Sequence, residues 1–125
     1  MAPLSAAERQ AILTRARDLF NSGEYWLAHE ALETVWRSII RDGDDDVARV
    51  WQGLIQAAAA LLHLERGNRH GVAAVGGAAL EKLAGPLRPD VEFEIEGFRA
   101  QLARALAGEG DPPRLEFRKD ARERH

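Results

Sequence analysis

The chain contains no cysteine, few aromatic residues and no long hydrophobic run, and each absence narrows what the protein can be. Without cysteine it can form no disulfide bond, no thiolate zinc site and no cysteine nucleophile. Aromatic residues make up only 6% of its 125 residues. No apolar stretch approaches the roughly 18 to 20 residues that a membrane-spanning helix needs, so we expect no membrane partner.

An excess of positive charge is also missing. The 17 lysine and arginine residues are outnumbered by 20 aspartate and glutamate residues, and the net charge is −3. Phosphate backbones require a concentrated positive field, so we expect no nucleic-acid partner. The first ten residues lack the basic segment and apolar run of a signal peptide. Together with the lack of cysteine, this start predicts a cytoplasmic protein.

Alanine and leucine supply most of the hydrophobic 46%, and both favour helices over strands. A chain of this length holds one hydrophobic core. The sequence therefore predicts an all-α protein, a compact bundle of four to five helices built around an antiparallel helical hairpin. We expect one domain over residues 1–107 and a charged C-terminal tail over residues 108–125, extended or partly disordered, with Leu115 and Phe117 as its anchors.

The helix boundaries are predicted from apolar spacing and capping residues. The first helix begins after Ser5, which forms a capping box with Glu8, and ends at Gly23. Asp90 is the predicted N-cap of the last helix. No strand pattern is recognised. The four later helices are expected at residues 25–41, 47–66, 69–83 and 90–107.

The second predicted helix carries polar residues among aromatic ones. At about 100° per residue, His29 and Glu33 fall on one flank of the buried face, with Trp26 and Trp36 beside them. An unpaired charge among tryptophans would be costly. The next helix is apolar on nearly every side, yet Gln52, Gln56 and His63 fall within one narrow sector. Since the two helices are antiparallel neighbours, these two groups can face each other.

Three interpretations of this cluster stay open. A His–Glu–Gln hydrogen-bond network could fix the helix register. The cluster could instead bind a small ligand or a protein, with Trp26, His29, Glu33, Trp36, Gln52, Gln56 and His63 lining the site. In the third, His29, Glu33 and His63 hold a divalent metal, as in a metal-dependent hydrolase. We favour a non-catalytic binding module over an enzyme and assign no cofactor; apolar surface around Trp26 would suggest a homodimer.

Two known metal-binding motifs are each excluded by a single residue. His29-Glu30 begins like the metalloprotease HExxH, but Glu33 occupies the position of the second histidine. The acidic run of residues 42–46 begins like a calcium loop, but Val47 replaces the required glycine. We interpret this run as a loop that caps the following helix, because its carboxylates suit the positive end of the helix dipole.

Two stretches resemble a known family. They run from Leu19 to Arg37 and from Trp51 to Asn68. The residues that carry the likeness are Phe20, Gly23-Glu24-Tyr25, His29-Glu30, Glu33, Trp36, Gln52-Gly53, Ile55-Gln56, His63 and Gly67-Asn68. This pattern is similar to that of the domain of unknown function 309 family, small helical proteins with no assigned activity. The resemblance implies a compact helical bundle. It also implies that the His, Glu and Gln positions belong to the sequence signature of the family.

Overall fold

The structure, a computed structural model, describes residues 4–41, 43, 45–86 and 90–119. These residues form five helices and no strand beyond one isolated bridge, which confirms the all-α bundle. In this part of the chain, no helix combines the length and apolarity that crossing a membrane requires. The helices are α1 (Ala6–Asn21), α2 (Tyr25–Arg41), α3 (Asp45–Glu65), α4 (Arg69–Leu83) and α5 (Ile95–Leu106).

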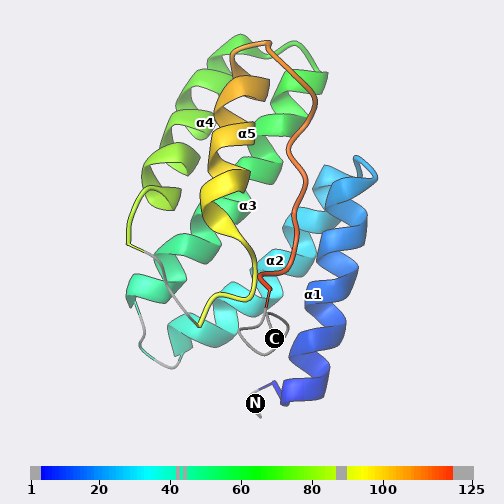
Figure 1. Cartoon of the computed structure of the whole chain (residues 1–125), viewed down its shortest axis with the longest axis vertical. Coiled ribbons are helices and arrows are strands. Elements are labelled where there is room, and N and C mark those ends of the chain that lie inside the picture. Colours follow the sequence, from blue (N-terminus) through cyan, green and yellow to red (C-terminus); the bar gives the residue numbers. More distant parts are fainter. Residues whose placement is uncertain (1–3, 42, 44, 87–89, 120–125) are drawn as a thin grey trace.

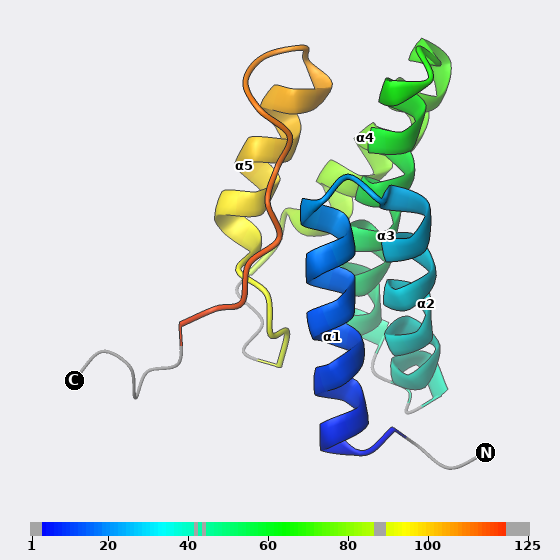
Figure 2. The ribbon, with the colours of Figure 1, turned by 90° about the vertical axis from the view of Figure 1, so that its right-hand side faces the viewer.

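Helices α1 to α4 follow one another across the molecule, each antiparallel to the one before (Figure 1). Helix α5 and the C-terminal segment stand on one side of this row, as the turned view in Figure 2 shows. The core lies between the row and this cover. Trp51 of α3 is fully buried there, and its ring meets Phe93 edge-on at 5.8 Å between centroids.

Local signals set the ends of α1. The Ser5 side chain accepts from the Glu8 backbone N–H, and the Glu8 carboxylate accepts from the Ser5 N–H, both at 3.0 Å. This capping box was predicted, and these bonds lower the pKa of Glu8. The helix ends where Gly23 takes a φ of +85°, a backbone conformation that glycine adopts without steric cost.

Helix α4 forms over the predicted residues despite its glycines, because two of them make room for neighbours. A Cβ on Gly71 would lie 2.6 Å from the His63 ring, and one on Gly76 would lie 2.7 Å from a methyl carbon of Leu106. Close packing against α3 and α5 therefore offsets the helix propensity that glycine lacks.

The prediction was wrong about the start of α5. This helix begins at Ile95, and its N-cap is Glu94 rather than Asp90. Residues 91–94 are extended instead, because they pair with the C-terminal segment. The Glu94 N–H donates to the Glu116 carbonyl, and the Arg118 N–H donates to the Glu92 carbonyl, both at 2.8 Å.

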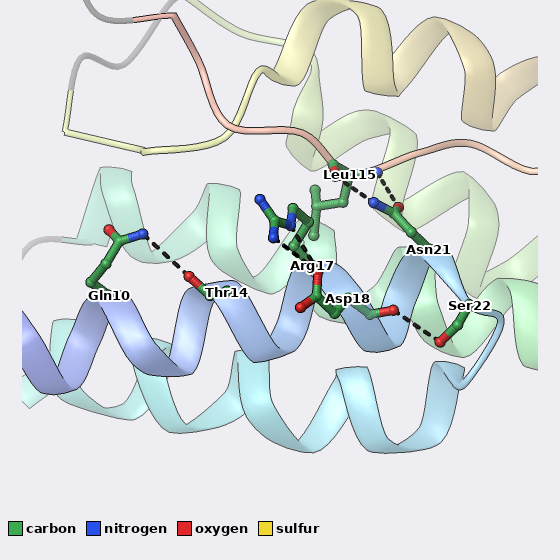
Figure 3. Close-up of polar contacts among 7 residues, drawn as sticks. All are labelled: Gln10, Thr14, Arg17, Asp18, Asn21, Ser22 and Leu115. Carbon is green, nitrogen blue, oxygen red and sulfur yellow. Dashed lines mark hydrogen bonds and ion pairs between the residues drawn. The ribbon is translucent and has the colours of Figure 1, made fainter.

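The C-terminal segment packs on the bundle between α5 and α1 (Figure 1). Leu115 is fully buried, and Phe117 stacks on Phe93 at 4.9 Å, so both expected anchors contact the core. The Asn21 amide binds both backbone groups of Leu115: its nitrogen donates to the carbonyl at 2.9 Å and its oxygen accepts from the N–H at 2.7 Å (Figure 3). We call these contacts and the pairing of Glu92 and Glu94 the C-terminal clamp.

An ion pair adds a further contact between α1 and the clamp. The Arg9 guanidinium binds both carboxylate oxygens of Glu92, at 2.6 and 2.9 Å, and lies over the Trp51 ring. This two-pronged contact raises the pKa of Arg9. Two predicted features fall outside the described residues: Asp42 and Asp44 of the acidic run, and residues 120–125 of the tail.

Candidate functional site

The candidate site lies on the flanks of α2 and α3 that face away from the core. On α2, His29, Glu33 and Trp36 are half-buried, while the Trp26 side chain is 58% exposed. The spacing of these residues by three and four positions places them on one flank of the helix. The centre of its buried face is formed by Ala28, Leu32, Val35 and Ile39.

On α3, Gln52 and Gln56 are half-buried on the side opposite Leu54 and Leu61, which belong to the core. Helices α2 and α3 are joined by a short connection and pack side by side. We name the polar and aromatic residues on these two flanks the α2–α3 strip: Trp26, His29, Glu33, Trp36, Gln52 and Gln56.

Trp26 and His29 form one flat unit on the surface of α2. Their rings stack with 5.3 Å between centroids and only 10° between planes. The indole is a large aromatic group that the fold leaves in solvent, although burying it would be favourable. One face of the indole covers the imidazole, and the opposite face is available for contact.

Two polar atoms of the α2–α3 strip are buried without a hydrogen-bond partner among the described residues. They are Nδ1 of His29 and Oε1 of Gln56. Buried polar atoms are almost always paired, because an unpaired one costs about 1–3 kcal/mol. Among the described residues, no hydrogen bond links the polar side chains of α2 to those of α3. The predicted network that would fix the register is therefore not formed.

The carboxylate of Glu33 pairs with a residue of its own helix. It lies 3.5 Å from the Arg37 guanidinium, one turn further along α2. Ion pairs of this kind at a helix surface contribute only about 0.3–0.5 kcal/mol. Glu33 therefore presents a partly neutralised, half-buried carboxylate beside His29 rather than a free anionic centre.

His63 belongs to a different contact from the rest of the predicted site. Its ring packs against α4 at Gly71, and its Nδ1 lies 3.2 Å from the Asn68 amide nitrogen. Since the Asn68 oxygen accepts from the Gly71 N–H, the nitrogen is the donor and His63 Nδ1 the acceptor. His63 thus fixes the turn between α3 and α4.

Among the described residues, no three His, Asp or Glu side chains are grouped so that they could hold a metal ion. His29, Glu33 and His63 are all described, so they do not form the metal site that their spacing suggested. The reason is structural: Gly71 has no side chain, and the His63 ring occupies the space that this leaves.

Two exposed leucines outside the α2–α3 strip were not predicted. Leu27 and Leu64 are each 40% exposed. Leu64 is near the end of α3 and Trp26 near the start of α2, so the antiparallel packing places them at the same end of the bundle. Helical spacing gave no signal for Leu64, because nearly all of α3 is apolar and exposure depends on where neighbouring helices stop.

Tyr25 is buried beside this end of the α2–α3 strip and is the only tyrosine of the chain. Burial raises the pKa of its hydroxyl, and the negative charge of Glu65 raises it further. Its ring packs edge-on against Phe20 at 5.2 Å. Tyr25 therefore fixes the start of α2 against α1.

The fold and site define a five-helix bundle with a polar strip on one exposed side. Residues 13–75, about half of the chain, match the family described as "Domain of unknown function (DUF309)". The chain belongs to this family. All residues of the α2–α3 strip, and His63, fall within the matched range, whereas α5 and the C-terminal clamp beyond Asn21 fall outside it.

An uncharacterised protein of Aquifex aeolicus (strain VF5) is 29% identical to the chain over 116 residues. The similarity covers 91% of this chain but only 34% of that protein, so the chain spans about a third of its relative's length. No solved structure shows a significant match.

Proposed function

We propose that the chain is a non-catalytic binding module that contacts a protein partner through the α2–α3 strip. One observation carries the proposal: an exposed indole covers an imidazole whose buried nitrogen has no hydrogen-bond partner among the described residues. Rotation of Trp26 about its side-chain bonds would uncover His29, and a partner group could then bond to Nδ1. The same partner could satisfy Oε1 of Gln56.

A protein partner fits this surface better than a small ligand does. The α2–α3 strip is a helix surface with a projecting tryptophan, and tryptophan is enriched among residues that dominate binding energy at interfaces. The relative from Aquifex aeolicus supports this view, because the region similar to this chain is joined there to twice as much further sequence.

Photo-crosslinking tests the proposal directly. A benzophenone amino acid would replace Trp26 in one version of the full chain and Ala11, exposed on α1, in a second version. Expressed in the host cell, the first version should yield a discrete cross-linked protein that the second does not. That protein, once purified, becomes the probe for affinity measurements. Equal products from both positions, or no product, would overturn the proposal.

Affinity for the purified partner then separates the α2–α3 strip from its surroundings. Trp26→Ala should weaken binding more than tenfold, as expected for an anchoring residue. Leu27→Ala is the matched control, because Leu27 is exposed on the same turn of α2 but lies off the α2–α3 strip. Circular dichroism would show that both variants keep their helices. Similar losses in both variants would contradict a role specific to the strip.

A further inference from the structure

A second surface feature lies away from the α2–α3 strip, between α4 and α5. A hollow of about 710 Å³ opens there, within the range of small-molecule sites. Its walls are mainly apolar, formed by Leu64, Val72, Leu80 and Leu106 with glycine and alanine between them. Figure 2 shows the start of α4 and the end of α5 spread apart at the top of the bundle, where most of these residues lie.

Glycine at position 77 is not explained by the packing of this chain. Gly71 and Gly76 are required because a Cβ would collide with His63 and Leu106, respectively. A Cβ on Gly77 would have nothing within 4 Å, although Gly77 lines the hollow in the middle of a helix. Alanine would stabilise the helix more at such a position. The missing side chain thus keeps open a space that no part of the described chain uses.

The hollow has charge at one end only. Arg69 is the one charged residue among those lining it, and among the described residues it has no ion-pair partner. It is the first residue of α4. The walls beyond it are apolar, so the hollow matches a molecule with an anionic head and a hydrocarbon tail.

We propose that the groove between α4 and α5 binds a single-chain amphiphile with an anionic head group, such as a fatty acid. The head pairs with Arg69, and the tail lies over Gly77 between Val72, Leu80 and Leu106. This site goes beyond the proposed function, because none of its residues belongs to the α2–α3 strip. Either proposal can fail without the other.

Dodecanoate, used below its aggregation concentration, is the probe for isothermal calorimetry with the full chain. Dodecanol and dodecyltrimethylammonium carry the same tail with a neutral and a cationic head. We expect dodecanoate to bind with a stoichiometry of one and at least about tenfold more tightly than the cationic probe. A cationic probe that binds equally well, or dodecanoate that does not bind, overturns the proposal.

Gly77→Leu is the decisive variant, because a Cβ at this position meets no atom within 4 Å and the rest of the side chain would extend into the hollow that Gly77 lines. It should fold normally and lose at least about tenfold in affinity for dodecanoate. Ala74→Leu, exposed on α4 outside the groove, is the matched control and should bind as the parent does. Unchanged binding by Gly77→Leu, or equal losses in both variants, overturns the proposal.

Arg69→Gln separates the head group from the tail. This variant should weaken the binding of dodecanoate several-fold and leave the binding of dodecanol unchanged. Equal effects on the affinity for both probes would refute the role of the head group. Sedimentation equilibrium of the parent without a probe tests the rival occupant, a helix of a second copy. Dimerisation abolished by Gly77→Leu would assign the groove to self-association and overturn the proposal.

Discussion

The C-terminal clamp and the α2–α3 strip contain similar residue types but treat their polar groups in opposite ways. In the clamp, the Asn21 amide binds both backbone groups of Leu115, and the Glu92 carboxylate is held by two nitrogens of Arg9. In the strip, a histidine nitrogen and a glutamine oxygen are buried with no hydrogen-bond partner in the part of the chain that the structure describes. Satisfied polar groups stabilise a fold, whereas buried unsatisfied ones lower its stability.

The largest effect should follow from breaking the clamp. Asn21→Ala leaves the N–H and carbonyl of Leu115 unpaired at a partly buried site, so we expect a loss of about 1–3 kcal/mol in the free energy of unfolding. Urea denaturation followed by circular dichroism would measure it.

Gln10→Ala is the control for Asn21→Ala. Gln10 is exposed on the same helix, and its amide donates to the Thr14 hydroxyl at 3.4 Å (Figure 3). We expect this variant to change the free energy of unfolding by less than about 0.5 kcal/mol. If the two variants lose equal stability, the clamp contributes nothing beyond an ordinary surface contact, and the contrast with the strip disappears.

A substitution in the α2–α3 strip should raise the free energy of unfolding rather than lower it. Gln56→Met keeps a similar side-chain volume and removes the unpaired oxygen, so the free energy of unfolding should rise by about 1 kcal/mol. Gln52→Met is the control on the same flank, since no buried unpaired atom is removed there, and it should change stability by less than about 0.5 kcal/mol. A loss of stability in Gln56→Met would show that the amide has a structural role.

The clamp and the strip also differ in how far the sequence predicted them. The ends of α1, α2 and α4 were predicted because their signals are local, such as the capping box at Ser5 and the turn at Gly23. The start of α5 was not, because the pairing of Glu92 and Glu94 with residues more than twenty positions away overrides the capping preference of Asp90. The alternation of apolar and polar residues in 91–95 and 115–118 was the available signal.

In the candidate site, spacing along one helix placed His29 and Glu33 correctly on one flank of α2. It could not show that His63 turns toward α4, since that depends on the space left by Gly71 and on the amide of Asn68. The same limit applies to the groove beside Gly77: a sequence shows that glycine is present, but only the packing shows whether a neighbour needs its space. Contacts between helices therefore decided most of what was missed.

The smallest expected effect concerns Tyr25, which lies between the core and the exposed end of the strip. Its pKa is raised in the folded chain, mainly by burial and further by Glu65, so folding holds the proton more tightly. The stability that this contributes is fully present below the ordinary tyrosine pKa and is lost as the pH rises through the raised value. The Tyr25→Phe variant has no hydroxyl to ionise. The wild-type chain should therefore lose stability relative to this variant only in that alkaline range. This loss should be smaller than the loss caused by Asn21→Ala.

Because Tyr25 is the only tyrosine, the ultraviolet absorbance of tyrosinate reports its ionisation alone. Titration of the folded chain should give a midpoint above that of the chain in denaturant. Glu65→Gln removes the repulsive charge but not the burial, so it should lower the midpoint only part of the way. Equal midpoints in the folded and denatured chain would mean that water reaches the hydroxyl, and that the fold opens at the end where Trp26 and Leu64 are exposed.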